Sequence, residues 1–134
     1  MQPNELRKKL HGVIAFPVTP FKKDLSLDLD GLRGNLRSLL KHPVCAVVAA
    51  AGTGELYSLS PAEHLQVVKT TLAEVNGRVP VIAGAGFNPP IAAELAQQAA
   101  AAGVSRRTRS RRCRRLRRRS DGRERSAQGT SREP

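Results

Sequence analysis

Aromatic residues and cysteines are scarce in this sequence of 134 residues. Aromatics make up 3% of the chain and tryptophan is absent, so any core must be built from aliphatic side chains. The two cysteines, Cys45 and Cys113, are too few for a disulfide framework or a zinc site. We therefore expect no metal, no cofactor and a reducing, cytoplasmic environment.

Long hydrophobic segments are also absent. No apolar run reaches the roughly 18 residues that a membrane-spanning helix needs, so no membrane partner is expected. Residues 1–12 carry charges with no apolar segment behind them, which excludes a secretory signal as their explanation. The length allows one folded domain at most.

Lysine is missing from the last part of the chain, where arginine is abundant. Residues 104–134 hold 13 arginines and 3 acidic residues, a net charge of +10, whereas residues 1–103 have a net charge of only +2. All aromatic residues lie in the first part: Phe16, Phe21, Tyr57 and Phe87. The sequence therefore predicts an ordered domain over residues 1–103 and a disordered, arginine-rich tail over residues 104–134.

Strands and helices alternate in the first part. Three uncharged apolar runs predict buried strands: residues 13–16, 44–51 and 79–83. An amphipathic helix is predicted after each run, with one N-cap residue apiece: Asp28, Ser60 and Asn88. The middle helix has the strongest start signal, since Pro61 stands at its first position and Glu63 completes a capping box with Ser60. A short helix over residues 3–9 precedes the first strand.

This order, strand then helix three times, predicts an α/β fold with a parallel sheet and right-handed crossovers. Two architectures fit: a doubly wound sheet or the start of a (β/α)₈ barrel. Hydrophobic periodicity does not choose between them. A complete barrel typically takes about 250 residues, so this chain could hold only part of one.

Turns rich in glycine and proline follow each predicted strand, over residues 16–20, 52–55 and 84–88. In both architectures a ligand binds at this carboxyl edge of the sheet. Glycine lets the backbone approach a ligand, backbone N–H groups can hold an anion, and Thr53 adds a hydroxyl donor. Each turn alone is more typical of a tight connection, but three together at strand ends favour a ligand site. Neither glycine pair extends into the G-x-G-x-x-G motif of dinucleotide-binding proteins.

Three blocks of sequence carry a family resemblance: HGVIAFPVTPF, AAAGTGELYSLSPAEH and RVPVIAGAG. In this order and spacing they resemble the dihydrodipicolinate synthase / N-acetylneuraminate lyase family over about residues 10–103. The resemblance implies the N-terminal three βα units of an incomplete (β/α)₈ TIM barrel. It also implies a lyase, usually a homotetramer, that joins a barrel lysine to the keto group of a 2-oxo acid or keto sugar acid as a Schiff base.

The resemblance assigns roles to residues at the carboxyl edge. The family's Gly-Thr pair, which binds the carboxylate of the keto acid, falls on Gly52 and Thr53. The neighbouring residues expected to shape the site are Pro17, Thr19, Gly54 and Glu55. Many dihydrodipicolinate synthases have a second threonine where this chain has Gly52. The resemblance is therefore closer to relatives such as 5-dehydro-4-deoxyglucarate dehydratase, which dehydrates and decarboxylates a keto sugar acid, with a 4-hydroxy-tetrahydrodipicolinate synthase-like aldolase as the alternative.

The catalytic residues of the family have no counterpart here. No tyrosine follows Tyr57 and no lysine follows Lys69, which lies in a predicted helix with a solvated side chain. No catalytic residue is therefore assigned, and we expect this chain by itself to be inactive.

Three interpretations of the arginine-rich tail remain. It could be the out-of-frame translation of a GC-rich gene, since such reading produces many arginines and few lysines. It could be a basic arm that makes the chain a non-enzymatic nucleic-acid-binding protein, although no aromatic residue accompanies the arginines for stacking. It could also be a solvated terminus without function. A further, weaker alternative is a subunit that completes a barrel with a separate chain.

Overall fold

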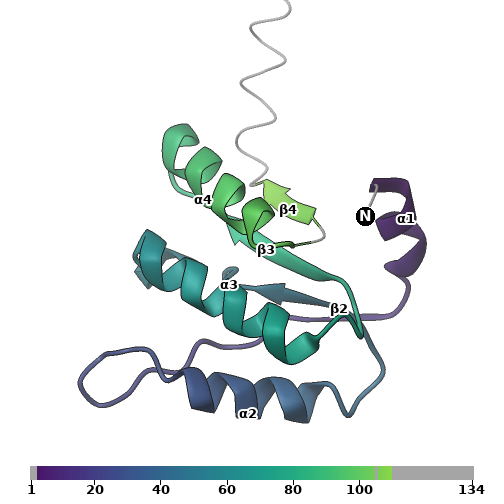
Figure 1. Cartoon of the computed structure of the whole chain (residues 1–134), viewed down its shortest axis with the longest axis horizontal. Helices are drawn as coiled ribbons and strands as arrows, with labels where there is room; N and C mark the ends of the chain where they lie inside the picture. Colours follow the sequence, from purple (N-terminus) through teal and green to yellow (C-terminus); the bar gives the residue numbers. More distant parts are fainter. Residues whose placement is uncertain (1–2, 105, 110–134) are drawn as a thin grey trace, which may run out of the picture.

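Four parallel strands form one open sheet in the order β1-β2-β3-β4 (Figure 1). The structure is a computed structural model that describes residues 3–104 and the backbone of residues 106–109. The strands are β1 (Val13–Ala15), β2 (Val44–Ala49), β3 (Val81–Ala85) and β4 (Arg106–Arg109). The helices are α1 (Pro3–Lys9), α2 (Leu29–Leu39), α3 (Pro61–Val75) and α4 (Pro89–Ala101), with a 3₁₀ turn η1 (Leu56–Ser58).

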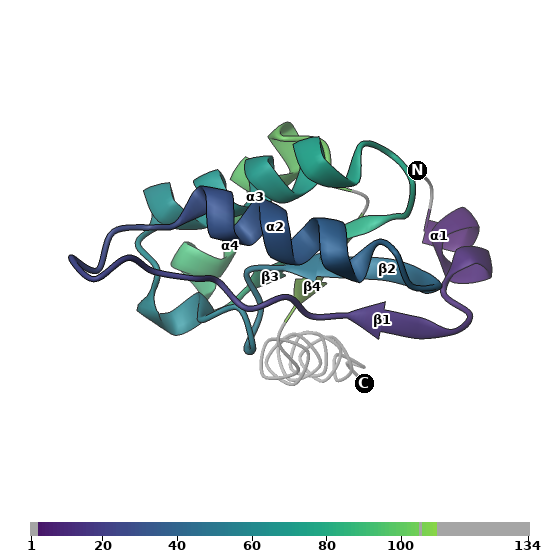
Figure 2. The same cartoon turned by 90° about the horizontal axis from the view of Figure 1, so that it is seen from below.

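The arrangement of layers decides between the two candidate architectures. Helices α2, α3 and α4 cover the same face of the sheet (Figure 2), and each strand pairs with its neighbour in sequence. A doubly wound sheet reverses its strand order and carries helices on both faces. Sequential strands with all connecting helices on one face are typical of a (β/α)₈ barrel. The predicted α/β fold with part of a barrel is therefore confirmed.

An aliphatic core lies between the helices and the sheet. Val47 and Ala49 of β2 pack with Leu32 and Leu36 of α2 and with Val68 of α3, and each of these side chains is at most 1% exposed. All four aromatic residues are exposed in the structure. The prediction of a core without aromatic side chains is therefore confirmed for the described residues.

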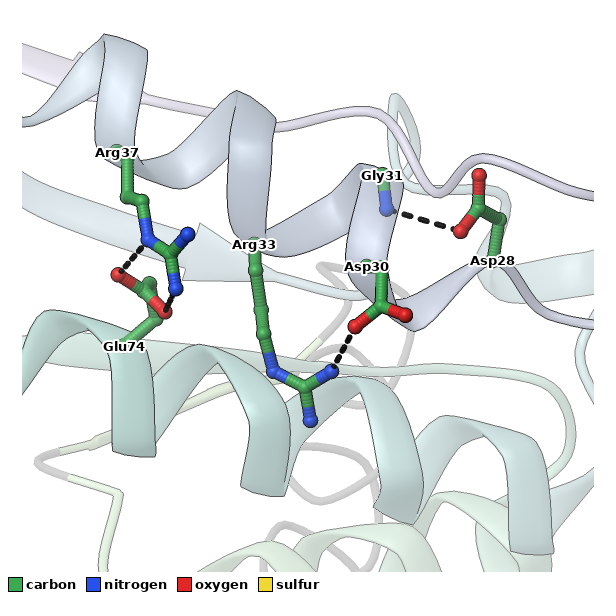
Figure 3. Close-up of polar contacts among 6 residues, drawn as sticks. All are labelled: Asp28, Asp30, Gly31, Arg33, Arg37 and Glu74. Carbon is green, nitrogen blue, oxygen red and sulfur yellow. Dashed lines mark hydrogen bonds and ion pairs between the residues drawn. The ribbon is translucent and has the colours of Figure 1, made fainter.

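Each predicted N-cap is confirmed. The Asp28 carboxylate accepts a hydrogen bond from the Gly31 N–H at 2.9 Å (Figure 3), and the Asn88 side chain accepts one from the Ile91 N–H at 3.1 Å. Ser60 and Glu63 form the reciprocal capping box. The Ser60 hydroxyl and N–H both donate to the Glu63 carboxylate, which holds the pKa of Glu63 below its ordinary value. Each predicted cap residue therefore forms its hydrogen bond within the first turn of its own helix, as expected.

One ion pair joins neighbouring helices. Arg37 of α2 donates to both carboxylate oxygens of Glu74 on α3, from Nε at 2.9 Å and from Nη2 at 3.3 Å (Figure 3). The Glu74 side chain is only 14% exposed, while that of Arg37 is 64% exposed. This bidentate contact links α2 to α3 in one geometry. Because the pair lies close to solvent, it contributes at most about 1 kcal/mol to the free energy of unfolding.

All three predicted strands differ from the prediction at one or both ends, and β1 ends at Ala15 rather than at residue 16. β2 ends at Ala49 rather than at residue 51, because Ala50 turns the chain with a φ of 45°. β3 begins at Val81, opposite Val47, and continues through Gly84 and Ala85, which were expected in a turn. The ladder between β3 and β4 includes these last two residues, so pairing with the next strand prolongs β3.

The fourth strand was not expected. Residues 104–134 were expected to form a disordered tail, but Arg106–Arg109 form β4 and pair in parallel with β3, from Ile82 opposite Arg106 to Ala85 opposite Arg109. A β-ladder uses backbone N–H and C=O groups, which arginine provides as well as any other residue except proline. The rest of the predicted tail, including Cys113, lies outside the described residues.

β2 and β3 approach each other closely at their carboxyl ends. The carbonyl oxygen of Ala50 lies so near Gly84 that a Cβ atom there would overlap it, and the Cα of Ala51 would be only 2.9 Å away. Both neighbours are backbone atoms, so they cannot swing aside as a flexible side chain could. Glycine is therefore required at this position of β3.

A buried histidine joins α3 to the same point. His64 is 1% exposed, and its Nε2 lies 2.9 Å from the carbonyl oxygen of Gly84. The carbonyl can only accept, so Nε2 carries the hydrogen, and Nδ1 has no partner among the described residues. Burial lowers the pKa of His64, with the Gly84 hydrogen bond acting in the opposite direction. The ring is therefore held neutral.

We expect Gly84→Ala to lower the free energy of unfolding by about 2–3 kcal/mol, because the backbone of β2 must shift to admit the methyl group. Urea unfolding followed by circular dichroism measures this loss. Gly34→Ala is the matched control: it lies within α2 with nothing within 4 Å of its added Cβ, so it should stabilise the helix by up to about 1 kcal/mol. Equal stability of Gly84→Ala and the wild type would contradict the close approach.

We expect the free energy of unfolding to fall as the pH drops below about 6.5, the ordinary pKa of histidine. The unfolded chain then binds a proton at His64 that the folded chain still excludes, and the fall ends below the lowered folded pKa. Urea unfolding at pH 7.5 and 5.5 measures the difference. His64→Gln should abolish most of it, whereas exposed His42→Gln should not; an unchanged pH dependence in His64→Gln would refute the assignment.

Candidate functional site

The candidate site lies where the carboxyl ends of β1 and β2 meet. After β1 the chain runs through Pro17 to Thr19, and both residues are buried. The Thr19 hydroxyl donates a hydrogen bond of 2.8 Å to the carbonyl oxygen of Gly54, 35 residues away in sequence. A Cβ on Gly54 would lie 3.2 Å from the carbonyl oxygen of Pro17. The structure therefore brings together three of the four residues that were expected to shape the site.

Glu55, the fourth of these residues, closes the turn through its backbone. It adopts a left-handed conformation with a φ of 59°, and its N–H donates to the Gly52 carbonyl at 3.2 Å. Its carboxylate accepts a hydrogen bond from the Ser58 hydroxyl at 3.1 Å. The side chain of Glu55 thus supports η1, and the backbone of Glu55 supports the turn that holds Gly52 and Thr53.

Gly52 and Thr53, the predicted carboxylate-binding pair, are exposed at the tip of this turn. Within the described part of the chain, neither backbone N–H forms a hydrogen bond, and the Thr53 hydroxyl has no partner. Adjacent N–H groups of a turn and a nearby hydroxyl are donors suited to a carboxylate or phosphate. The arrangement can therefore bind an anion. The assignment of that anion as a substrate carboxylate stays a prediction.

Among the described residues, no lysine amine suited to covalent chemistry lies at this edge. All lysines are exposed and none lies on a strand: Lys8, Lys9, Lys22, Lys23, Lys41 and Lys69. Tyr57, the chain's one tyrosine, is 66% exposed and packs edge-to-face on Phe87 with ring centroids 5.2 Å apart. The described residues can bind and orient an anion, but they present no buried amine to a keto group.

The described residues offer neither a metal site nor a membrane-spanning helix. Over residues 3–104, no three His, Cys, Asp or Glu side chains are grouped closely enough to hold a metal ion. No helix of the described residues has the length and apolarity to cross a membrane. Cys45 is a free thiol. The nucleic-acid interpretation depends on arginine side chains of residues 106–132, which lie outside the described side chains.

Sequence reasoning missed two contacts near the site. One is the hydrogen bond of His64 to Gly84, and the other is the ring contact of Tyr57 with Phe87. The sequence did fix the position of His64 on its helix, because the capping box places His64 one residue after Glu63, about one turn from the helix start. Periodicity alone does not indicate which strand such a side chain will meet.

Known proteins similar to this chain were then compared with it. The sequence profile of the Dihydrodipicolinate synthetase family matches residues 9–107. A probable 5-dehydro-4-deoxyglucarate dehydratase from Ralstonia nicotianae is 50% identical over 93 residues, which are 69% of this chain and 30% of that protein. A protein of the same name from a Bradyrhizobium species is 46% identical over 105 residues, 78% of this chain and 33% of its own length.

Solved structures agree with these sequence matches. Dihydrodipicolinate synthase from Bacillus clausii is 33% identical with a TM-score of 0.73, covering 76% of this chain and 35% of that one. The enzyme from Acinetobacter baumannii, solved with pyruvate, is 34% identical with a TM-score of 0.70, covering 73% of this chain and 34% of its own. The chain thus spans about a third of the length of its relatives. The family match, the sequential parallel strands and the Gly-Thr-Gly-Glu turn together show that this chain belongs to the Dihydrodipicolinate synthetase family.

Proposed function

We propose that this chain is the substrate-carboxylate-binding part of a lyase of the 5-dehydro-4-deoxyglucarate dehydratase type. The observation that carries the proposal is the turn at the end of β2, where Gly52 and Thr53 are exposed and their donors have no partner among the described residues. Relatives that are named as this dehydratase share 43–50% identity with the chain. Glycine at position 52, in place of a second threonine, favours the dehydratase over the alternative synthase-like aldolase.

The chemistry of the whole enzyme would proceed through a Schiff base. A lysine amine adds to the keto carbon and water leaves, which makes an imine that draws electrons from the neighbouring carbon. That lysine would belong to a later barrel strand, so this chain contributes binding and orientation alone. The Gly52 and Thr53 N–H groups and the Thr53 hydroxyl would fix the carboxylate, while Pro17, Thr19 and Gly54 hold the turn in place.

The arginine-rich segment is proposed to be an out-of-frame translation of the gene that encodes such a lyase. The family match ends at residue 107, and the change in composition begins at residue 104. The isolated chain would then have no Schiff-base lysine and no turnover. A homotetramer is proposed only for the complete lyase; one matched structure, at 33% identity, is described as a monomeric dihydrodipicolinate synthase variant.

A chimera tests the proposed function. Residues 1–103 of this chain replace the matching third of the Ralstonia dehydratase, and we expect the hybrid to consume 5-dehydro-4-deoxyglucarate and release carbon dioxide. Thr53→Val in the hybrid should lower kcat/KM about 10-fold to 100-fold, the range for losing one hydrogen bond to a charged group. Ser58→Ala, which removes an exposed hydroxyl that bonds Glu55, is the control and should have little effect.

Three outcomes of the chimera experiment would contradict the proposal. The first is a folded hybrid that leaves the sugar acid intact, and the second is Thr53→Val activity equal to that of the parent hybrid. The third is a hybrid that instead condenses pyruvate with an aldehyde, which would favour the aldolase. The natural chain, treated with pyruvate and borohydride, should form no adduct, and mass spectrometry detects one if it does.

The frame proposal has its own test. Reading the gene in all three frames from codon 104 onward should reveal, in another frame, an apolar strand, an aromatic segment with a tyrosine and a later lysine. Independent resequencing of the locus distinguishes a sequencing error from a genuine shift. The absence of such a continuation in every frame would exclude the proposal and leave the arginine-rich segment as a true part of the product.

A further inference from the structure

The Gly-Thr turn (residues 50–56) rests on the carboxyl end of β3. A Cβ atom on Gly84 would overlap the carbonyl oxygen of Ala50, where the turn begins. A Cβ atom on Gly86 would lie 3.0 Å from the side chain of Leu56, where the turn ends. Both ends of the turn therefore pack against glycines at or just after the end of β3.

Backbone hydrogen bonds close the Gly-Thr turn on itself. The Leu56 N–H donates to the Ala51 carbonyl at 3.1 Å, and the Glu55 N–H donates to the Gly52 carbonyl at 3.2 Å. A turn closed in this way keeps its own shape. Its position relative to the sheet is therefore set by the groups that it contacts outside itself.

Two supports outside the turn involve hydrogen bonds. On the β1 side, the Thr19 hydroxyl donates to the Gly54 carbonyl at 2.8 Å. On the β3 side, the His64 side chain on α3 is 1% exposed, and its Nε2 lies 2.9 Å from the carbonyl oxygen of Gly84. Apolar packing between a helix and a sheet has no preferred direction, whereas a hydrogen bond requires a distance and an angle. The His64 bond therefore defines where Gly84 lies relative to α3.

Stability alone does not account for a histidine at this position. Nδ1 of His64 is buried and has no hydrogen-bond partner among the described residues. Leaving such a group unpaired costs about as much free energy as a neutral hydrogen bond contributes, or more. The polar atoms of His64 therefore bring no net stability, and what the ring supplies is the directional bond to Gly84.

We propose that His64 is a positioning residue for the carboxylate of a small 2-oxo acid. Its Nε2 hydrogen bond holds Gly84 in place, and Gly84 packs on Ala50, from which the chain continues into the donors of Gly52 and Thr53. A displacement of about 1 Å at a binding group is enough to weaken recognition of a ligand. The inference rests on the function proposed above for the Gly-Thr turn.

Two amide side chains of different length test the reach of His64. In His64→Gln the amide nitrogen takes the place of Nε2 and can still donate to Gly84, whereas the shorter His64→Asn places it near the position of Nδ1. In NMR spectra of the isotope-labelled full chain without ligand, the amide signals of Gly52 and Thr53 should move in His64→Asn and stay near their wild-type positions in His64→Gln. Val75→Ala opens a cavity at the opposite end of α3, so it controls for lost stability and should leave both signals in place.

Titration of the same proteins with pyruvate measures the affinity of the turn. The dissociation constant should rise about 10-fold in His64→Asn, as when a hydrogen bond to a charged group is weakened, and less than about 2-fold in His64→Gln and Val75→Ala. Equal affinity of His64→Asn and the wild type, or an equal loss in both His64 variants, would overturn the inference alone. If the wild type binds no pyruvate, the function proposed for the turn fails, and this inference fails with it.

The wild type alone provides a measurement that does not depend on how the variants fold. NMR of the histidine ring nitrogens should show the hydrogen of His64 on Nε2 at neutral pH. A hydrogen on Nδ1 would leave the ring with nothing to donate to Gly84, and it would overturn the inference.

Discussion

The close packing of Ala50 against Gly84 is the constraint on which the carboxyl edge of the sheet depends. The Ala50 carbonyl occupies the space that a side chain at Gly84 would need, so β2 and β3 can meet there only through glycine. Ala50 also takes a positive φ, which ends β2 and directs the chain into the turn with Gly52 and Thr53. The close approach to Gly84 and the end of β2 therefore both involve Ala50.

Further contacts hold the same region from two sides. His64 reaches from α3 to the Gly84 carbonyl, and Thr19 reaches from the segment after β1 to the Gly54 carbonyl. In each contact a side chain donates a hydrogen bond to the backbone carbonyl of a glycine. The two glycines therefore take part in holding the region although they have no side chains. These contacts hold a turn in which Gly52 and Thr53 are exposed to solvent, and that turn is the basis of the proposed anion site.

Local features of the fold were predictable, while contacts between elements were not. The caps at Asp28, Ser60 and Asn88 depend on residues three positions apart, so the sequence shows them directly. The choice between a barrel and a doubly wound sheet needed the strand order, which periodicity does not contain. β4 escaped prediction because composition describes side chains, whereas strand pairing uses the backbone.

For the candidate site, too, the location and the residue types were predictable from the sequence, whereas the contacts between its loops were not. Its location followed from parallel topology, since the ends of the strands must share one edge. The residues of the turn were proposed from residue type and family resemblance. The hydrogen bond between Thr19 and Gly54 spans 35 residues and involves two side-by-side loops. No pattern within one loop could indicate it, because the contact exists only after β1 and β2 have paired.

Pairing between sequence neighbours also bears on how the chain acquires its structure. Each described strand after β1 lies beside the strand that precedes it, with a single α-helix in each connection from β1 to β4. Each ladder joins residues that are 24 to 34 positions apart, from Ile82 opposite Arg106 to Val47 opposite Val81, so a whole helical crossover must close before two strands can pair, which slows folding. The unit of β1, α2 and β2 lies within residues 13–49, so it can still form before the later residues have been synthesised.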